Sequence, residues 1–259
     1  AKSVIEVAAD ISEGLARVAC AGEVDGEVVD LRTTLDKDCT LNILTANDEE
    51  GLRVLRHTAS HVMAEAVKRL FPNAKLAIGP AIDNGFYYDV YLDNGTISEA
   101  DLPKIEEEMR KIVAANYPFE RRDVSVAKAI DWSISGNQSF KVELLNDLKR
   151  SGTTIASELA GEKMGSVSDG DSKVETVSLY SKGDYNDLCR GGHVDNTGKV
   201  GAFKLTKTAG AYWRGNENNP QMQRIYGVAF ATQEELDEYL NRLEIAKQRD
   251  HRKLGKELD

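Results

Sequence analysis

The stretch "LRVLRHTASHVMAEAVKRLF", residues 52–71, is the strongest secondary-structure signal in the chain. Its apolar residues recur every three or four positions, which predicts an amphipathic helix that ends before Pro72. This helix carries His57 and His61 four residues apart, so both imidazoles lie on one helix face, within reach of a common object.

The sequence before this helix predicts a small α+β module. "SVIE", residues 3–6, matches a capping box and indicates a helix from about Val4 to Asp10. "LARVACAGEVDGEVVDL", residues 15–31, has two strand-like halves around the turn signal Asp25-Gly26, and "CTLNIL", residues 39–44, predicts another strand. Three strands give one helix little sheet to cover, so the module is either very small or lacks its beginning. "ANDEEGL", residues 46–52, is a polar junction and the predicted domain boundary.

The sequence after this helix predicts a second α+β domain with a mainly antiparallel sheet. "GFYYDVYL", residues 85–92, indicates a strand. A helix from Ser98 to Ala115 follows, with Pro103 near its first turn, and the stretch Gly161 to Lys173 predicts a mobile loop. The remaining predicted elements are helices at Ser125–Trp132, Ser139–Arg150 and Gln233–Leu258 and strands at Thr176–Tyr180, Asp187–Cys189, Ala202–Leu205 and Gln223–Phe230.

Length and composition limit the possible classes of protein. With 259 residues, of which 41% are hydrophobic, the chain can bury a real core and favours two domains. No apolar run is long enough to span a membrane and no signal peptide is visible, so a soluble, cytoplasmic protein is expected. Three widely spaced cysteines predict reduced thiols. A net charge of −10 argues against non-specific affinity for nucleic acid, so a nucleic-acid partner needs a local basic surface.

Two pairs of residues carry the chemistry. The spacing of His57 and His61 is that of the zinc proteases, but Thr58 stands where those enzymes carry a catalytic glutamate. Cys189 and His193 repeat the spacing of four in "YNDLCRGGH", residues 185–193, around a turn with two glycines. The four side chains form a donor set for tetrahedral zinc, and equally a set for hydrolysing an ester without metal. Local capping, or a cysteine that is merely buried, is the alternative for each pair taken alone.

A basic segment with aromatic residues lies near the end of the second domain. "KLTKTAGAYWRGNENNPQMQRIYG", residues 204–227, combines four basic side chains with Tyr212, Trp213 and Tyr226. This composition suits the end of a nucleic acid, where phosphates meet basic groups and bases meet rings. An ordinary pair of strands with outward charges explains it equally well. The four basic residues are Lys204, Lys207, Arg214 and Arg224.

Taken together, the motifs resemble bacterial-type threonyl-tRNA synthetase. The resemblance rests on "RHTASHVMAEAVKRLFP", "AIGPAIDNGFYYDV", "DLCRGGH", "FKLTKTAGAYWRGNENNPQMQRIYG" and "RDHRKLGKELD", and it covers nearly the whole chain. It implies a ubiquitin-like (β-grasp) TGS domain at 1–46 that lacks its first strands. It further implies an α+β editing domain at 47–232 and a helical linker at 233–259 toward an absent aminoacylation core.

The resemblance implies editing: hydrolysis of seryl-tRNA(Thr), because a pocket built for threonine rejects serine by only about 1–3 kcal/mol. His57 is then the expected base or water-orienting residue and Lys141 assists it. Asp187 holds the substrate ammonium, while Cys189 and His193 position the ester and the terminal adenosine. The other substrate-binding residues implied are His61, Tyr88, Lys204, Lys207 and Arg214.

The implied partners are the acceptor end of tRNA(Thr) carrying serine and the remainder of a homodimeric synthetase, without a membrane. The resemblance implies no metal and no cofactor. One departure from the family pattern is Gly192, where the family usually has proline. Two other functions stay open: a zinc-dependent deacylase of the alanyl type, and a non-catalytic tRNA-binding appendage.

Overall fold

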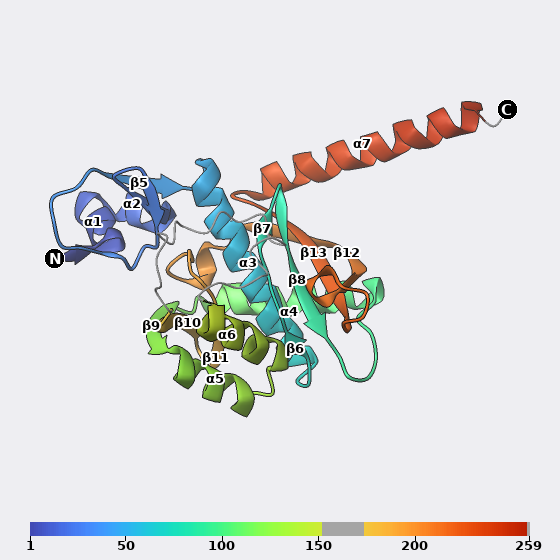
Figure 1. Ribbon diagram of the computed structural model, residues 1–259. Coiled ribbons are helices and arrows are strands. Elements are labelled where there is room, and N and C mark those ends of the chain that lie inside the picture. Colours follow the sequence, from blue (N-terminus) through green and yellow to red (C-terminus); the bar gives the residue numbers. More distant parts are fainter. Residues whose placement is uncertain (152–173, 258–259) are drawn as a thin grey trace.

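The computed structural model describes residues 1–151 and 174–257 (Figure 1). The predicted loop at 161–173 lies outside these residues. The helices are α1 (Val4–Ile11), α2 (Glu13–Val18), α3 (Glu49–Leu70), α4 (Leu102–Ala115), α5 (Val126–Ser135), α6 (Ser139–Ser151) and α7 (Gln233–Glu257), with 3-10 turns η1 (Glu99–Asp101), η3 (Thr197–Lys199) and η4 (Trp213–Gly215). The strands are β1 (Lys2–Ser3), β2 (Ala19–Val24), β3 (Glu27–Val29), β4 (Thr34–Leu35), β5 (Leu41–Thr45), β6 (Lys75–Leu76), β7 (Ala81–Ile82), β8 (Gly85–Tyr91), β9 (Glu120–Ser125), β10 (Thr176–Lys182), β11 (Tyr185–Leu188), β12 (Ala202–Tyr212) and β13 (Gln221–Phe230).

The N-terminal module contains one helix more than the sequence predicted. The capping box at Ser3 and Glu6 is formed and starts α1, and Asp25 and Gly26 take positive φ in the tight turn between β2 and β3. The predicted strand-like half beginning at Leu15 is wrong in its first part, because Glu13–Val18 is the helix α2 and the strand begins at Ala19. The Ser12 side chain accepts a hydrogen bond from the Leu15 backbone N–H and so caps this second helix.

Helix α3 runs through the centre of the molecule (Figure 1). The sequence predicted an amphipathic helix, but every residue from Thr58 to Val67 is buried. The reason is that α3 packs against elements on several sides at once: β2 and β5 of the N-terminal module, helix α4, and strands β7, β8 and β13. Residues of one helix therefore join the hydrophobic cores of both parts of the chain.

The second part of the chain contains two antiparallel sheets, which confirms the α+β class. One has the strand order β12-β13-β8-β6, with β7 also paired to β8, and the other has the order β11-β10-β9. Strand β8 is buried over six of its seven residues because it lies inside its sheet and under α3. Helices α5 and α6 pack against each other beside the second sheet, and α6 also touches β6 (Figure 1).

Helix α7 leaves the sheet at the end of β13 and projects away from the rest of the molecule (Figure 1). Its first turn contacts β12 and β13, and Leu236 is buried there. Among residues 1–151 and 174–257, no helix is both long enough and apolar enough to cross a membrane.

Candidate functional site

Four side chains converge between α3 and the segment after β11. They are His57 and His61 on α3 and Cys189 and His193 after β11, and one donor atom from each lies within 4.8 Å of all the others. The helical spacing of the first pair places both rings on one face, and the turn at Gly191 and Gly192 brings the second pair to them. The structure thus brings together the four residues that the two motifs had predicted.

Hydrogen bonds around the cluster define the tautomer of each histidine. His57 Nδ1 lies 3.0 Å from the carbonyl oxygen of Gly192, and His61 Nδ1 lies 2.8 Å from an Asp187 carboxylate oxygen. Both partners can only accept, so both Nδ1 atoms carry protons. His193 Nδ1 lies 3.1 Å from the Thr58 hydroxyl, which already donates its proton to the Val54 carbonyl and therefore accepts from His193.

Because each Nδ1 donates outward, the Nε2 atoms face the centre of the cluster. His57 Nε2 lies 3.1 Å from His61 Nε2 and 3.3 Å from Cys189 Sγ. His193 Nε2 is buried and makes no hydrogen bond among the described residues. Two lone pairs at 3.1 Å repel each other, so His57 and His61 need a proton or a cation between them.

A buried polar network contacts the Nδ1 side of the His61 ring. Asp187 accepts hydrogen bonds from His61 and from the Tyr88 hydroxyl at 2.9 Å, and it forms an ion pair with Lys141 of α6 at 3.1 Å. Burial alone would raise the pKa of the Asp187 carboxyl, but Lys141, His61 and Tyr88 hold that pKa well below its usual range. Lys141 Nζ also donates to Tyr88 Oη at 3.2 Å and to the Leu188 carbonyl at 3.3 Å. Asp187 is therefore a fully engaged carboxylate, and a substrate ammonium would have to displace one of these partners.

Burial also sets the protonation of the second pair. It lowers the pKa of His193 to about 3, so this ring is neutral near pH 7. Burial alone would raise the pKa of the Cys189 thiol, but the facing histidines His57 and His61 hold it well below its usual range. Of the four groups, His61 and His193 are buried, while His57 and Cys189 remain partly accessible to a substrate.

The turn that carries His193 depends on its two glycines. Gly191 has φ +108° and Gly192 has φ +78°, a region that favours glycine. Proline, which the family resemblance predicts at this position, holds φ near −65° and cannot adopt this conformation. The backbone at Gly192 therefore takes a conformation that proline would exclude.

Comparison with known proteins finds relatives of both parts of the chain. A profile of the TGS domain matches residues 1–45, and a profile described as the threonyl and alanyl tRNA synthetase second additional domain matches residues 177–226. Proteins named threonine–tRNA ligase from Acetivibrio thermocellus, Clostridioides difficile and Pelobacter propionicus are 52%, 48% and 47% identical to the chain. Each alignment covers 99% of this chain and 36–37% of the relative.

This chain is a relative of threonine–tRNA ligases. It matches their N-terminal part, including a TGS domain and an editing domain, and it spans a little over a third of the length of these relatives.

The four basic residues that were predicted to contact a nucleic acid all contact other residues of this chain. β12 and β13 form an antiparallel pair with one register shift between Leu205 and Lys207. Lys204 forms an ion pair with Glu106 of α4, and Lys207 lies over the Tyr226 ring at 4.8 Å. Arg214 is tied to Asp147 of α6, the helix that carries Lys141, and Arg224 makes two hydrogen bonds to Asp89. Lys204 and Lys207 are exposed and remain available to an anionic ligand.

Sequence reasoning missed several residues that hold the site together. Thr58 orients His193 through a hydrogen bond to its ring. The only sequence signal for this role was the position of Thr58 next to His57. Lys182 donates to the His61 carbonyl at 3.1 Å and forms a buried ion pair with Glu65. Asp30 and Arg32 contact the backbone of His193 from the N-terminal module, more than 160 residues earlier in the chain, and no motif in the sequence indicates them.

Proposed function

We propose that this chain edits mischarged tRNA by hydrolysing the seryl ester of Ser-tRNA(Thr). The observation that carries the proposal is the half-buried His57 ring, whose Nε2 lies within hydrogen-bond distance of Cys189 and His61 in a relative of threonine–tRNA ligases. Serine needs a second pocket because an aminoacylation pocket built for threonine discriminates against it by only about 1–3 kcal/mol.

His57 is the base in this proposal because it is the more accessible histidine and its tautomer is defined. The Gly192 carbonyl holds the Nδ1 proton, so Nε2 can accept a proton from water as the water oxygen bonds to the ester carbonyl carbon. The bond from that carbon to the ribose oxygen then breaks, the ribose oxygen takes up the proton, and serine leaves. The ribose hydroxyl beside the ester can help to orient the attacking water.

The other site residues position these groups. Lys141 assists indirectly, because its charge keeps Asp187 ionised and Asp187 in turn orients His61. Cys189 and His193 lie beside His57 and His61 and, in this proposal, hold the ester and the terminal adenosine. Lys204 and Lys207 are exposed on β12 and are candidates for contact with acceptor-end phosphates. Arg214 instead forms an ion pair with Asp147 of α6.

The same proposal covers the wider setting of the chain. We infer a TGS-like module at 1–46, an editing domain at 47–232 and a linker at 233–259. The partners are the acceptor end of tRNA(Thr) and the rest of a synthetase, which acts as a cytoplasmic homodimer. Full-length relatives from three bacteria support this setting, because each is named threonine–tRNA ligase.

Deacylation assays with the 259-residue chain test this function. Ser-tRNA(Thr) should lose serine while Thr-tRNA(Thr) stays charged, and His57→Ala should slow the reaction by roughly 100-fold because it removes the base. Arg53→Ala is the matched control, since Arg53 lies one turn earlier on α3 and is exposed. A loss of two-fold or less in His57→Ala would rule out the role of His57. Intact tRNA binding without hydrolysis in the parent chain would favour the non-catalytic appendage.

A zinc-dependent deacylase of the alanyl type is a second candidate, favoured by one specific observation. The three Nε2 lone pairs and Cys189 Sγ point at a common centre, and each Nδ1 donates to a carbonyl, carboxylate or hydroxyl oxygen, as metal-bound histidines do. These residues fit zinc, which would act there as a Lewis acid. Metal analysis of protein loaded with zinc and then dialysed discriminates the candidates. One zinc per chain, lost in Cys189→Ser, together with deacylation that a chelator abolishes, would favour this candidate.

A further inference from the structure

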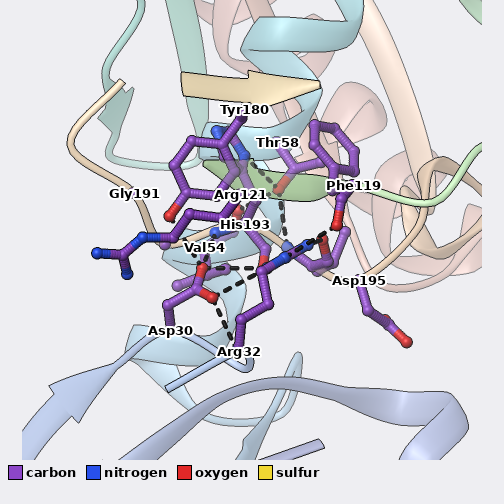
Figure 2. Close-up of polar contacts among 12 residues, drawn as sticks. Asp30, Arg32, Val54, Thr58, Phe119, Arg121, Tyr180, Gly191, His193 and Asp195 are labelled. Carbon is purple, nitrogen blue, oxygen red and sulfur yellow. Dashed lines mark hydrogen bonds and ion pairs between the residues drawn. The ribbon is translucent and has the colours of Figure 1, made fainter. Parts of the chain in front are cut away.

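We propose that Asp30 and Arg32 of the N-terminal module are positioning residues of the editing site, acting through the backbone of His193. The proposal rests on the proposed function, since it assigns these two residues to the reaction of that site. Figure 2 shows both side chains reaching from the N-terminal module to His193, with Tyr180 and Phe119 beside it.

Arg32 binds three backbone carbonyl oxygens, two of them in the segment that carries His193. Its guanidinium donates to the His193 carbonyl at 3.0 Å, to the Val194 carbonyl at 2.8 Å and to the Phe119 carbonyl at 2.9 Å (Figure 2). The rigid fork of arginine suits such a set of acceptors, whereas lysine offers a single point charge. One side chain therefore fixes two segments that are more than 70 residues apart.

Asp30 completes the contact by binding the N–H of the same residue. Its carboxylate accepts from the His193 backbone N–H at 3.2 Å and from the Tyr180 hydroxyl at 3.3 Å, and it pairs with Arg32 at 3.0 Å. Both the N–H and the C=O of His193 are thus held by the N-terminal module. The Asp30 side chain is only 5% exposed, so water competes little for these bonds.

The anchored residues also hold the His193 ring. The ring stacks on His57 with centroids 4.5 Å apart and, on its other face, on Phe119 at 5.0 Å. Since Arg32 binds the carbonyls of both His193 and Phe119, it aligns the stack that ends at His57, the proposed base. The neighbouring Gly191 and Gly192 give this segment unusual backbone freedom, which the contact from Asp30 and Arg32 restrains.

The test uses the full chain and compares variants that all retain the rest of the interface. Arg32→Met, Arg32→Lys and Asp30→Asn should each lower kcat for Ser-tRNA(Thr) deacylation at least ten-fold and leave KM within about two-fold, because positioning rather than binding is lost. Lys199→Met is the matched control: Lys199 also joins the two parts of the chain, through the Ala16 and Ala19 carbonyls. It does so without a contact to His193 or His57 among the described residues, so kcat should stay within two-fold.

A second readout separates failure of this proposal from failure of the proposed function. Amide hydrogen exchange at His193 reports its backbone contact even if the chain hydrolyses no ester. Exchange should be at least ten-fold faster in Asp30→Ala, which removes the acceptor of the His193 N–H, and unchanged in Lys199→Met, with both variants folded by circular dichroism. The proposal is overturned if exchange and kcat stay at parental values in the Asp30 and Arg32 variants, or if Lys199→Met lowers kcat equally.

Discussion

The backbone at residues 191 and 192 has a conformation that favours glycine, and a side chain would be tolerated to a different degree at each position. A Cβ at Gly191 would lie 2.4 Å from the Tyr180 hydroxyl, whereas a Cβ at Gly192 would lie 3.6 Å from the nearest Val54 methyl group. Substitution at Gly192 therefore meets only the strain of positive φ, while substitution at Gly191 also meets a buried side chain.

Gly192→Ala should lower the free energy of unfolding by about 1–2 kcal/mol, the usual cost of a non-glycine residue in this region. Gly191→Ala should lower it further, because the Tyr180 hydroxyl that binds Asp30 must move. Urea unfolding measures both changes. Gly95→Ala is the control, since Gly95 has φ +91° with open space around it and lies in a different loop. Equal losses in Gly191→Ala and Gly95→Ala would contradict the steric argument.

At the scale of elements, strand β10 is joined to α3 by a buried ion pair directly behind the cluster. Lys182 of β10 and Glu65 of α3 pair at 2.5 Å, and both are at most 4% exposed. Arg69, one turn later on α3, binds the other Glu65 oxygen at 2.7 Å. Burial lowers the pKa of Lys182, so its charge depends on Glu65.

Lys182→Met should destabilise the protein by about 3 kcal/mol, because it leaves the buried Glu65 carboxylate without its closest counter-charge. Adding Glu65→Gln to Lys182→Met removes the buried charge and should recover part of this loss. Denaturant unfolding of the single and double variants measures the coupling between the two residues. If the losses in the free energy of unfolding of the two single variants add up to the loss of the double variant, Lys182 and Glu65 have no coupling energy.

The sequence predicted long and periodic elements well and short or charged ones poorly. The helix α3 and the turn at Asp25-Gly26 were confirmed because periodicity and turn chemistry are local properties. Strand β9 was missed because "ERRDVS" is almost entirely exposed and charged and forms a strand only by pairing with β10. Helix α2 was missed because six residues carry too little periodicity, and its cap at Ser12 was not recognised.

The part of the candidate site that lies in recognisable motifs could be predicted from the sequence. His57, His61, Cys189 and His193 were predicted as one site from two spacings and a resemblance, and the structure brings them together. Their partners could not be predicted in this way. Asp30 and Arg32 act through backbone atoms of distant residues, and such contacts leave no pattern in the letters of the sequence.

At the scale of the whole molecule, one hydrophobic cluster spans the boundary between the two parts of the chain. Cys20, Ala21 and Leu44 of the N-terminal module belong to the same buried cluster as α3 and β8. The polar contacts of Arg32 and Lys199 lie along the same boundary. Neither part can therefore unfold without exposing apolar surface of the other.

We expect the chain to unfold in a single cooperative transition, with the same midpoint by far-ultraviolet circular dichroism and by tryptophan fluorescence. Both tryptophans, Trp132 and Trp213, lie outside the N-terminal module, so fluorescence follows the second part alone. Ala21→Asp, which places a charge in the shared core, should lower the midpoint of both signals together. Two separated midpoints in the parent chain would show that the modules unfold independently.

The bonds between Arg32, Asp30 and His193 also have a consequence for the order of folding. They join residues 161 and 163 positions apart, so a very long loop must close before any of them can form. Contacts between such distant residues slow folding and form late. Helix α3 and the β2–β3 hairpin can form earlier, because their contacts join neighbouring residues. A refolding chain should therefore recover its helical signal well before it recovers deacylation. The delay between recovery of the helical signal and recovery of deacylation would measure how long the contacts around His193 take to form after the helices.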